Sequence, residues 1–252
     1  MMLIAECGVN WNDLGELITM FTRAKYAGAE AVKVQVFDRK TIKKSRSLHQ
    51  KTLLKLILDE VAVKDLSDIA HRMGLCFVAT PMYPEAVEMV APSVEAIKIR
   101  YADRYNLPLI TEALKVKKNL LVSCDEAYLE KEPPDSPSRE AREAVLGQPE
   151  PMLMYCVPEY PPKQFLPPET LGTLFKGFSS HYPNPWIPIT AAMMRCTTIE
   201  VHVTPNPKPA RRGQYSDSMR PFRYIDDPVS LTFDQLAFVS EKIKKPWGRV
   251  PW

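Results

Sequence analysis

Two short runs of apolar and β-branched residues in the second half of the chain each contain a histidine near their end. They span 176–181 and 198–204, and the segment 186–195 between them has the composition of a helix. A strand, a helix and a strand in this order predict a parallel βα unit. His181 and His202 are therefore expected at the carboxyl ends of neighbouring strands, whose backbones run roughly 4.8 Å apart.

This pair of histidines predicts a site for a divalent cation. Two imidazoles that project from the same ends of adjacent strands can converge on one ion. The alternative is that each histidine is buried and hydrogen-bonded within the core. The chain has only four histidines, and two of them in equivalent positions favour the metal.

Size and charge restrict the class of protein. With 252 residues, 45% of them hydrophobic, the chain can bury the core of one large α/β domain. A formal charge of +3 argues against a nucleic-acid partner. No run is long enough for a membrane span, and the first residues lack the features of a signal peptide. Five cysteines without a CxxC pair indicate a reducing compartment, so a cytoplasmic location is expected.

The order of predicted elements indicates a closed barrel. Each predicted strand is followed by helical or loop material, which is the pattern of a single-domain (β/α)8 TIM barrel over residues 1–252. Proline-rich irregular insertions are expected at 130–150 and 205–230, and an exposed basic loop at 40–51. The expected strands are 3–5, 31–37, 75–79, 96–99, 119–123, 152–157, 176–181 and 198–204; the expected helices are 14–26, 52–60, 63–73, 84–90, 106–116, 138–146, 168–174, 186–195 and 231–244.

A doubly wound open sheet is the alternative fold. It normally carries a glycine-rich turn after the first strand, and Gly8 alone does not supply one.

Polar residues at the strand ends predict an active site, because chemistry in a barrel of this kind takes place at the C-terminal face. Lys33 and Lys98 lie inside Val/Ile runs, where charge is costly. They either snorkel to solvent or form a structural ion pair with Glu6, or they are part of an anion site with neighbouring hydroxyls. Glu6 is a candidate acid or base. The strand-end set is Glu6, Lys33, Gln35, Thr80, Lys98, Ser123, Tyr160, Ser179, His181 and His202.

Eight short motifs across residues 3–244 resemble one enzyme family. They occur in the same order as in the N-acetylneuraminate (sialic acid) synthase family, the phosphoenolpyruvate-dependent nonulosonic acid synthases. The motifs are Ile4-Ala-Glu6-Cys-Gly8-Val-Asn10, Ala31-Val-Lys33-Val-Gln35, Ala79-Thr-Pro81, Ile97-Lys98-Ile99 with Asn106-Leu-Pro108, Leu121-Val-Ser123, Tyr155-Cys156 with Tyr160-Pro161, Ser179-Ser-His181 and Glu200-Val-His202.

The resemblance implies a carbon–carbon bond-forming transferase that condenses phosphoenolpyruvate with an aldose or amino sugar and releases phosphate. It implies that His181 and His202 bind Mn²⁺ or Mg²⁺, which acts as a Lewis acid. Glu6 is implied at the reacting centre, and Asp103 and Tyr160 beside the sugar. The implied phosphoenolpyruvate contacts are Lys33, Gln35, Thr80, Lys98, Ser123 and Ser179. Partners are then small molecules. The apolar segment 246–252 is expected either to dock on a second subunit, in a homodimer, or to fold on its own barrel.

Some positions depart from the family pattern. Tyr101 stands where a small phosphoenolpyruvate contact is usual, Pro158 replaces a polar residue, and Asp125 places an acid near the anion site. Asp217 matches a sugar-site aspartate weakly. The sequence ends at Trp252, without the family's C-terminal antifreeze-like domain, so another lid is expected, from 40–51 or from 205–228 with Arg211 and Arg212. Two alternatives remain: a metal-dependent barrel aldolase or lyase that does not use phosphoenolpyruvate, and a non-catalytic ligand-binding barrel.

Overall fold

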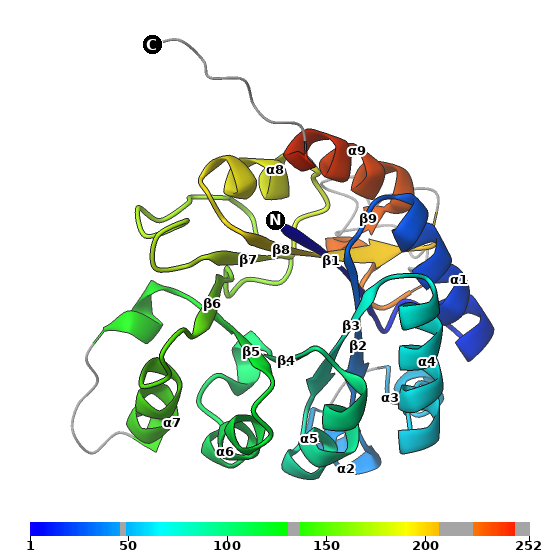
Figure 1. Ribbon diagram of the computed structural model, residues 1–252, viewed down its shortest axis with the longest axis horizontal. Coiled ribbons are helices and arrows are strands. Elements are labelled where there is room, and N and C mark those ends of the chain that lie inside the picture. Colours follow the sequence, from blue (N-terminus) through cyan, green and yellow to red (C-terminus); the bar gives the residue numbers. More distant parts are fainter. Residues whose placement is uncertain (46–48, 131–136, 207–223, 245–252) are drawn as a thin grey trace.

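The computed structural model contains a closed barrel of parallel strands (Figure 1). It describes residues 1–45, 49–130, 137–206 and 224–244. Each strand pairs with its neighbours in sequence, and β1 also pairs with β8, with Ile4 opposite Glu200 and Glu6 opposite His202. The (β/α)8 prediction is confirmed. The barrel strands are β1 (Met2–Gly8), β2 (Ala31–Val36), β3 (Cys76–Pro81), β4 (Ala96–Ile99), β5 (Asn119–Cys124), β6 (Met152–Tyr155), β7 (Gly177–Ser180) and β8 (Thr198–Thr204).

Helices surround the barrel (Figure 1). None of those in the described ranges is both long and apolar enough to cross a membrane. They are α1 (Leu14–Tyr26), α2 (Arg39–Ser45), α3 (Gln50–Leu53), α4 (Glu60–Arg72), α5 (Pro84–Val90), α6 (Leu107–Lys115), α7 (Pro137–Leu146), α8 (Trp186–Met193) and α9 (Phe233–Lys244). Single 3-10 turns are η1 (Ala91–Ser93), η2 (Tyr101–Asp103), η3 (Glu126–Leu129) and η4 (Asp227–Val229), and a short strand β9 (Leu231–Thr232) pairs in parallel with the end of β8.

Local chemistry explains the helix boundaries. Asp13 caps α1 by accepting a hydrogen bond from the backbone N–H of Glu16 at 2.9 Å. Leu17 and Phe21 bury one face of this helix against the barrel. The chain leaves the helix through Gly28 at φ +88°, a conformation that glycine adopts without strain. The prediction of a helix at 14–26 is therefore confirmed.

The barrel interior is arranged in layers along the strands. Six small and apolar side chains form one inner cluster: Ile4, Ala31, Val78, Ala96, Leu121 and Met154. Because side chains alternate between the two faces of a strand, the residue two positions further on again points inward. Those residues are Glu6, Lys33, Thr80, Lys98, Ser123 and Cys156. A polar layer thus lies directly above an apolar floor, at the carboxyl ends of the strands.

Three predicted segments differ from the structure. Residues 40–51 were expected to form a loop, but α2 and α3 occupy parts of this segment, and the helix expected at 52–60 ends at Leu53. The helix expected at 168–174 is absent among the described residues, where turns and a bridge between Leu171 and Phe175 are found instead. Gly172 has φ +82° and lies so close to the backbone that follows α8 that a Cβ would be 1.6 Å from the carbonyl oxygen of Met194.

Some predictions fall outside the described residues. Helix α7 occupies part of the expected insertion at 130–150. Residues 46–48, 131–136, 207–223 and 245–252 are not described. Arg211, Arg212, Asp217 and the segment 246–252 therefore remain predictions.

Candidate active site

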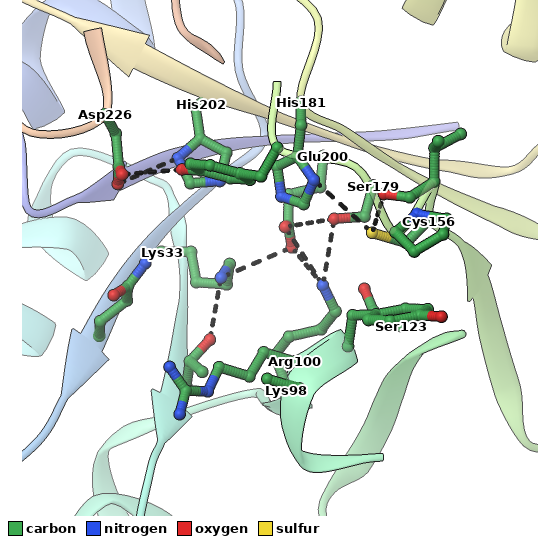
Figure 2. A pocket seen from close by; sticks show the side chains of 17 residues that line it. Lys33, Lys98, Arg100, Ser123, Cys156, Ser179, His181, Glu200, His202 and Asp226 are labelled. Carbon is green, nitrogen blue, oxygen red and sulfur yellow. Dashed lines mark hydrogen bonds and ion pairs between the residues drawn. The ribbon is translucent and has the colours of Figure 1, made fainter. Parts of the chain in front are cut away.

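Two buried lysines meet two buried glutamates at the C-terminal end of the barrel; Figure 2 shows Glu200 with both lysines. The Lys33 amine lies 2.7 Å from a Glu6 oxygen and 3.7 Å from Glu200, and the Lys98 amine lies 3.1 Å from Glu200. All four residues are at most 4% exposed. The structural ion pair considered for Lys33 and Glu6 is therefore present, within a larger charge cluster.

Glu200 connects the two lysines and was not among the predicted site residues. Burial alone would raise the pKa of its carboxyl, but Lys33 and Lys98 lower this pKa well below the usual range. Burial lowers the pKa of Lys98, and Glu200 only partly reverses this effect. The pKa of Lys33 is raised because two carboxylates outweigh its burial. Side chains alternate in direction along β8, so the residue two positions before His202 must face the same way. This rule could have identified Glu200 from the sequence.

Hydroxyl groups surround the cluster of lysines and glutamates. Thr80 accepts a hydrogen bond from the Lys33 amine at 2.9 Å, and Ser179 donates one to Glu200 at 2.9 Å. The buried Ser123 hydroxyl has no hydrogen-bond partner within the described part of the chain. A buried hydroxyl without a partner is costly, so Ser123 is available to a bound molecule.

These groups line a cavity of about 340 Å³. His181 and His202 line it too, and in Figure 2 they lie in a row with Asp226 along one side, while Lys98 and Glu200 lie at the centre. The full lining is Lys33, Gln35, Thr80, Lys98, Arg100, Tyr101, Ala102, Ser123, Cys156, Val157, Pro158, Tyr160, Ser179, His181, Glu200, His202 and Asp226.

The two imidazole rings lie next to each other, with their centroids 5.1 Å apart and their planes tilted by 51°. The His202 Nδ1 atom lies 3.4 Å from an Asp226 oxygen, and the His181 Nδ1 atom lies 3.6 Å from the Cys156 sulfur. Burial, followed by the neighbouring His202, lowers the pKa of His181 to about 3, so this ring is neutral. Burial also disfavours charge on His202, but Asp226 raises its pKa above the usual value.

This donor set fits a divalent cation held by two protein nitrogens. In metal sites the second ring nitrogen of a ligating histidine usually bonds to a carboxylate or similar group. The Asp226 carboxylate lies 3.4 Å from the His202 Nδ1 atom and the Cys156 sulfur 3.6 Å from the His181 Nδ1 atom, so the Nε2 atoms would be the ligands to an ion. No group of three or more His, Cys, Asp or Glu side chains suited to a metal occurs in the ranges that the structure describes. The remaining ligands of such an ion would be water and substrate.

Tyr160 and Asp226 form the wall beside the histidines. The Tyr160 hydroxyl donates a hydrogen bond to Asp226 at 2.7 Å, and its ring packs edge-on against His181 at a centroid distance of 4.8 Å. Tyr160 is therefore placed in the cavity, as its sequence position indicated. Asp226 was missed, because it follows a long proline-containing segment without strand periodicity. The side chain of Asn10 fixes it by accepting a hydrogen bond from its backbone N–H at 2.9 Å.

Glu6 lies beside the cavity and not among the residues that line it. Its carboxylate bonds to Lys33 and accepts a hydrogen bond from the Gln35 amide at 2.9 Å. Gly8, at φ +48°, permits this packing, since a Cβ there would be 2.9 Å from Asp226 and 3.1 Å from Glu6. Glu6 thus acts on the cavity through Lys33 and Gln35.

Asp103 is also outside the lining. Its carboxylate bonds to the guanidinium of Arg100, which does line the cavity. Asp103 thus holds Arg100 at the edge of the cavity, and its expected place beside a sugar stays a prediction.

Tyr101 forms a fixed aromatic wall. Its hydroxyl donates a hydrogen bond to Asp125 at 2.7 Å, and the Arg104 guanidinium lies 3.7 Å from its ring centroid. Asp125, which the sequence predicts near the anion site, therefore accepts a hydrogen bond from Tyr101.

Comparison with family models matches most of the chain to one family. The sequence model of the NeuB family matches residues 20–221. The N,N'-diacetyllegionaminic acid synthase of Campylobacter jejuni is 28% identical over 233 residues, covering 81% of this chain and 67% of the relative. An uncharacterized protein of Methanocaldococcus jannaschii is 26% identical over 218 residues, covering 80% of this chain and 61% of the relative. The chain thus spans about two thirds of the length of these relatives.

Solved structures share the fold. The sialic acid synthetase of Leptospira borgpetersenii superposes with a TM-score of 0.74 at 22% identity, over 96% of this chain and 82% of that one. A spore coat polysaccharide biosynthesis protein of Bacillus subtilis superposes with a TM-score of 0.70 at 23% identity. The match covers 97% of this chain and 67% of that one. At these identities the likeness concerns the barrel alone.

Proposed function

The chain belongs to the NeuB family, and from this premise we propose that it condenses phosphoenolpyruvate with the aldehyde of a sugar. A bond forms between the enol carbon and the aldehyde carbon, and the aldehyde oxygen takes up a proton. The oxygen of a water molecule adds to the phosphate-bearing carbon, whose bond to the phosphate oxygen breaks. The products are a 2-keto sugar acid and inorganic phosphate.

One observation carries this proposal: the two buried lysines and the paired imidazoles open into the same cavity of about 340 Å³. A condensation needs an anionic donor and an aldehyde held side by side, because orientation of two reactants removes much of the barrier. Lys98, Ser123 and Ser179 provide cationic and hydroxyl groups on one side, and His181 and His202 provide nitrogen ligands on the other.

The donor half would bind the carboxylate and phosphate of phosphoenolpyruvate. The Lys33 and Lys98 amines supply charge-assisted hydrogen bonds, which are stronger than neutral ones. The Ser123 hydroxyl, which has no partner within the described ranges, supplies a further donor. Glu200 holds both amines in place before the substrate enters.

The acceptor half would orient the aldehyde. A divalent cation bound by His181 and His202 supplies Lewis-acid polarisation of a carbonyl oxygen. Asp226 keeps the His202 ring in position, and the Tyr160 ring packs against His181. Gln35 and Tyr160 offer polar groups beside this site for sugar hydroxyls.

The test is phosphate release from phosphoenolpyruvate with Mn²⁺ and a panel of aldoses, together with mass detection of the keto acid. We expect release that depends on both substrates, and a loss of at least 10²-fold in kcat/KM for Lys98→Met. Lys64→Met, at an exposed lysine on α4, is the matched control and should retain activity. Phosphate release unaffected by Lys98→Met would remove the donor assignment.

A metal-dependent aldolase that uses pyruvate is the second candidate. It is favoured by the carboxylates that already face both lysine amines and by the Tyr101 ring in the cavity wall. This activity would exchange the methyl protons of pyruvate with deuterium and release no phosphate. Ligand binding without exchange or phosphate release would indicate a non-catalytic barrel.

A further inference from the structure

The outer faces of α2 and α3 and the turn that follows them carry charge of one sign. Between Asp38 and Asp59 the sequence contains seven lysines and arginines and no aspartate or glutamate. Six of these basic residues lie in the described ranges, and all six are exposed. We call them the basic rim: Arg39, Lys40, Lys43, Lys44, Lys51 and Lys55.

The basic rim lacks the partners that exposed lysines have on other helices. On α4, for example, the Lys64 amine lies 2.8 Å from a carboxylate oxygen of Asp68. Among the described residues, no carboxylate forms an ion pair with a side chain of the basic rim. Lys40 and Lys44 are also four residues apart on α2, a spacing at which like charges destabilise a helix. Stabilisation of the helix therefore does not explain this charge.

The basic rim lies beside the mouth of the catalytic cavity. The inner faces of α2 and α3 line a smaller cavity of about 120 Å³, which we call the side cavity. The side cavity shares Gln35 and Arg100 with the catalytic cavity. The two helices contribute Thr41, Ile42, Ser45 and Leu53 to its wall. Their outer faces, with the basic rim, are therefore at the β2 side of the mouth.

The catalytic cavity contributes little attraction to an anion that is still in solution. Its two buried lysine amines face the carboxylates of Glu6 and Glu200, and the guanidinium of Arg100 faces Asp103. Opposite charges that lie so close together largely cancel at longer distances. Long-range attraction of an anion therefore requires charge outside the cavity.

We propose that the basic rim attracts the small anionic substrate of the catalytic cavity, an inference that rests on the proposed condensation for the identity of this substrate, phosphoenolpyruvate. That molecule carries about three negative charges at neutral pH. Charge of one sign around a cleft raises the local concentration of an oppositely charged substrate and its association rate by about 10–10³-fold. A large polyanion such as nucleic acid is disfavoured, because the net charge of the chain is only +3.

Two double variants with equal changes in charge test the proposal. Lys43→Glu combined with Lys44→Glu reverses two charges of the basic rim and is the rim variant. Lys115→Glu combined with Lys176→Glu is the control variant. Its two exposed positions lie at the last residue of α6 and directly before β7, at the opposite end of the barrel from the mouth.

Titration calorimetry with phosphoenolpyruvate, without aldose so that no turnover occurs, measures the Kd. At an ionic strength of about 0.02 M we expect the rim variant to bind about tenfold more weakly than the unchanged protein, and the control variant less than about threefold more weakly. At about 1 M salt, where the screening length is about 3 Å, the difference should vanish. Equal Kd values for the two variants at low salt would overturn the proposal. Lys51→Glu with Lys55→Glu replaces the rim variant if thermal unfolding shows that it is misfolded.

The effect should scale with the charge of the ligand. Coulomb energy is proportional to charge, so a tenfold effect on phosphoenolpyruvate corresponds to about a twofold effect on pyruvate, which carries a single negative charge. The KM of the neutral aldose and kcat should stay unchanged in the rim variant. Equal weakening for both anions would show damage to the cavity and contradict the proposal.

These measurements separate the basic rim from the proposed reaction. Charge-dependent weakening without phosphate release would retain the basic rim and reject the condensation. Phosphate release with equal Kd values in the two variants would retain the condensation and reject the basic rim. If the unchanged protein does not bind phosphoenolpyruvate, the same comparison of Kd with pyruvate decides: weaker binding by the rim variant alone supports the proposal, and equal binding overturns it.

Discussion

Glu200 and His202 point into the same cavity from one strand, so the carboxylate that holds both lysines is rigidly connected to one of the two imidazoles. Residues two apart in a strand project from the same face. Because β8 also pairs with β1, Glu6 is opposite His202 in the adjacent strand. Backbone pairing within the barrel therefore fixes the distance between the lysines of the donor half and the histidines of the acceptor half.

Glu200→Gln should strongly destabilise the protein. The amide keeps the shape of the side chain but removes the charge that balances Lys98, and an uncompensated buried charge costs about 3–5 kcal/mol. Urea unfolding should show this decrease in the free energy of unfolding. Asp68→Asn removes an exposed partner of Lys64 and should change it by at most about 1 kcal/mol. Equal effects of the two variants would show that Glu200 is not essential to charge balance.

Asp226→Asn should weaken metal binding without removing a direct ligand. Loss of the group that orients a ligating histidine typically costs about 10–100-fold in metal affinity. Titration calorimetry with Mn²⁺ measures the change. Asp234→Asn, at an exposed position of α9, is the control. An unchanged Kd in Asp226→Asn would mean that His202 does not need this partner.

Chelation should abolish turnover, and added Mn²⁺ or Mg²⁺ should restore it. His181→Ala and His202→Ala should not be restored, because each loses one of the two nitrogen ligands. His71→Ala, at an exposed histidine that pairs with Glu95, should behave like the unchanged protein. Full activity in chelator would refute a role for a divalent cation in the reaction.

The strand-borne part of the site could be predicted from sequence because alternation fixes the direction of each side chain. Lys33, Lys98 and Ser123 follow an apolar inward residue by two positions, so their place in the polar layer follows from the pattern. Glu200 obeys the same rule but was overlooked beside the more conspicuous His202.

Other parts of the site depend on contacts that no local pattern encodes. Asp226 reaches His202 from a loop, and its position depends on Asn10, 216 residues away in the sequence. Asp103 follows a strand end, but its carboxylate turns to Arg100 instead of the cavity. The side cavity depends on α2 and α3, in a segment whose basic composition predicted an exposed loop. Tertiary packing decided these features.

Tyr101→Phe tests whether the Tyr101 side of the cavity wall is held by a hydrogen bond. One Asp125 oxygen has no partner within the described ranges, and the other accepts the hydrogen bond from Tyr101. Removing the hydroxyl leaves the carboxylate further unsatisfied, and we expect a loss of about 1 kcal/mol in the free energy of unfolding.

This loss should depend on pH in one direction. Burial, and then Asp125, raises the pKa of Tyr101 above its usual value. The folded state therefore keeps this proton at a pH where the unfolded state has begun to release it, so the contribution of Tyr101 is complete below a pH of about 10 and declines above it. The stability difference between the unchanged protein and Tyr101→Phe should thus be constant at neutral pH and shrink in alkali. Urea unfolding at several pH values measures it, with Tyr26→Phe at an exposed tyrosine as the control. A difference that stays constant above that pH would show that Tyr101 is held by packing with Arg104 and not by its hydrogen bond to Asp125.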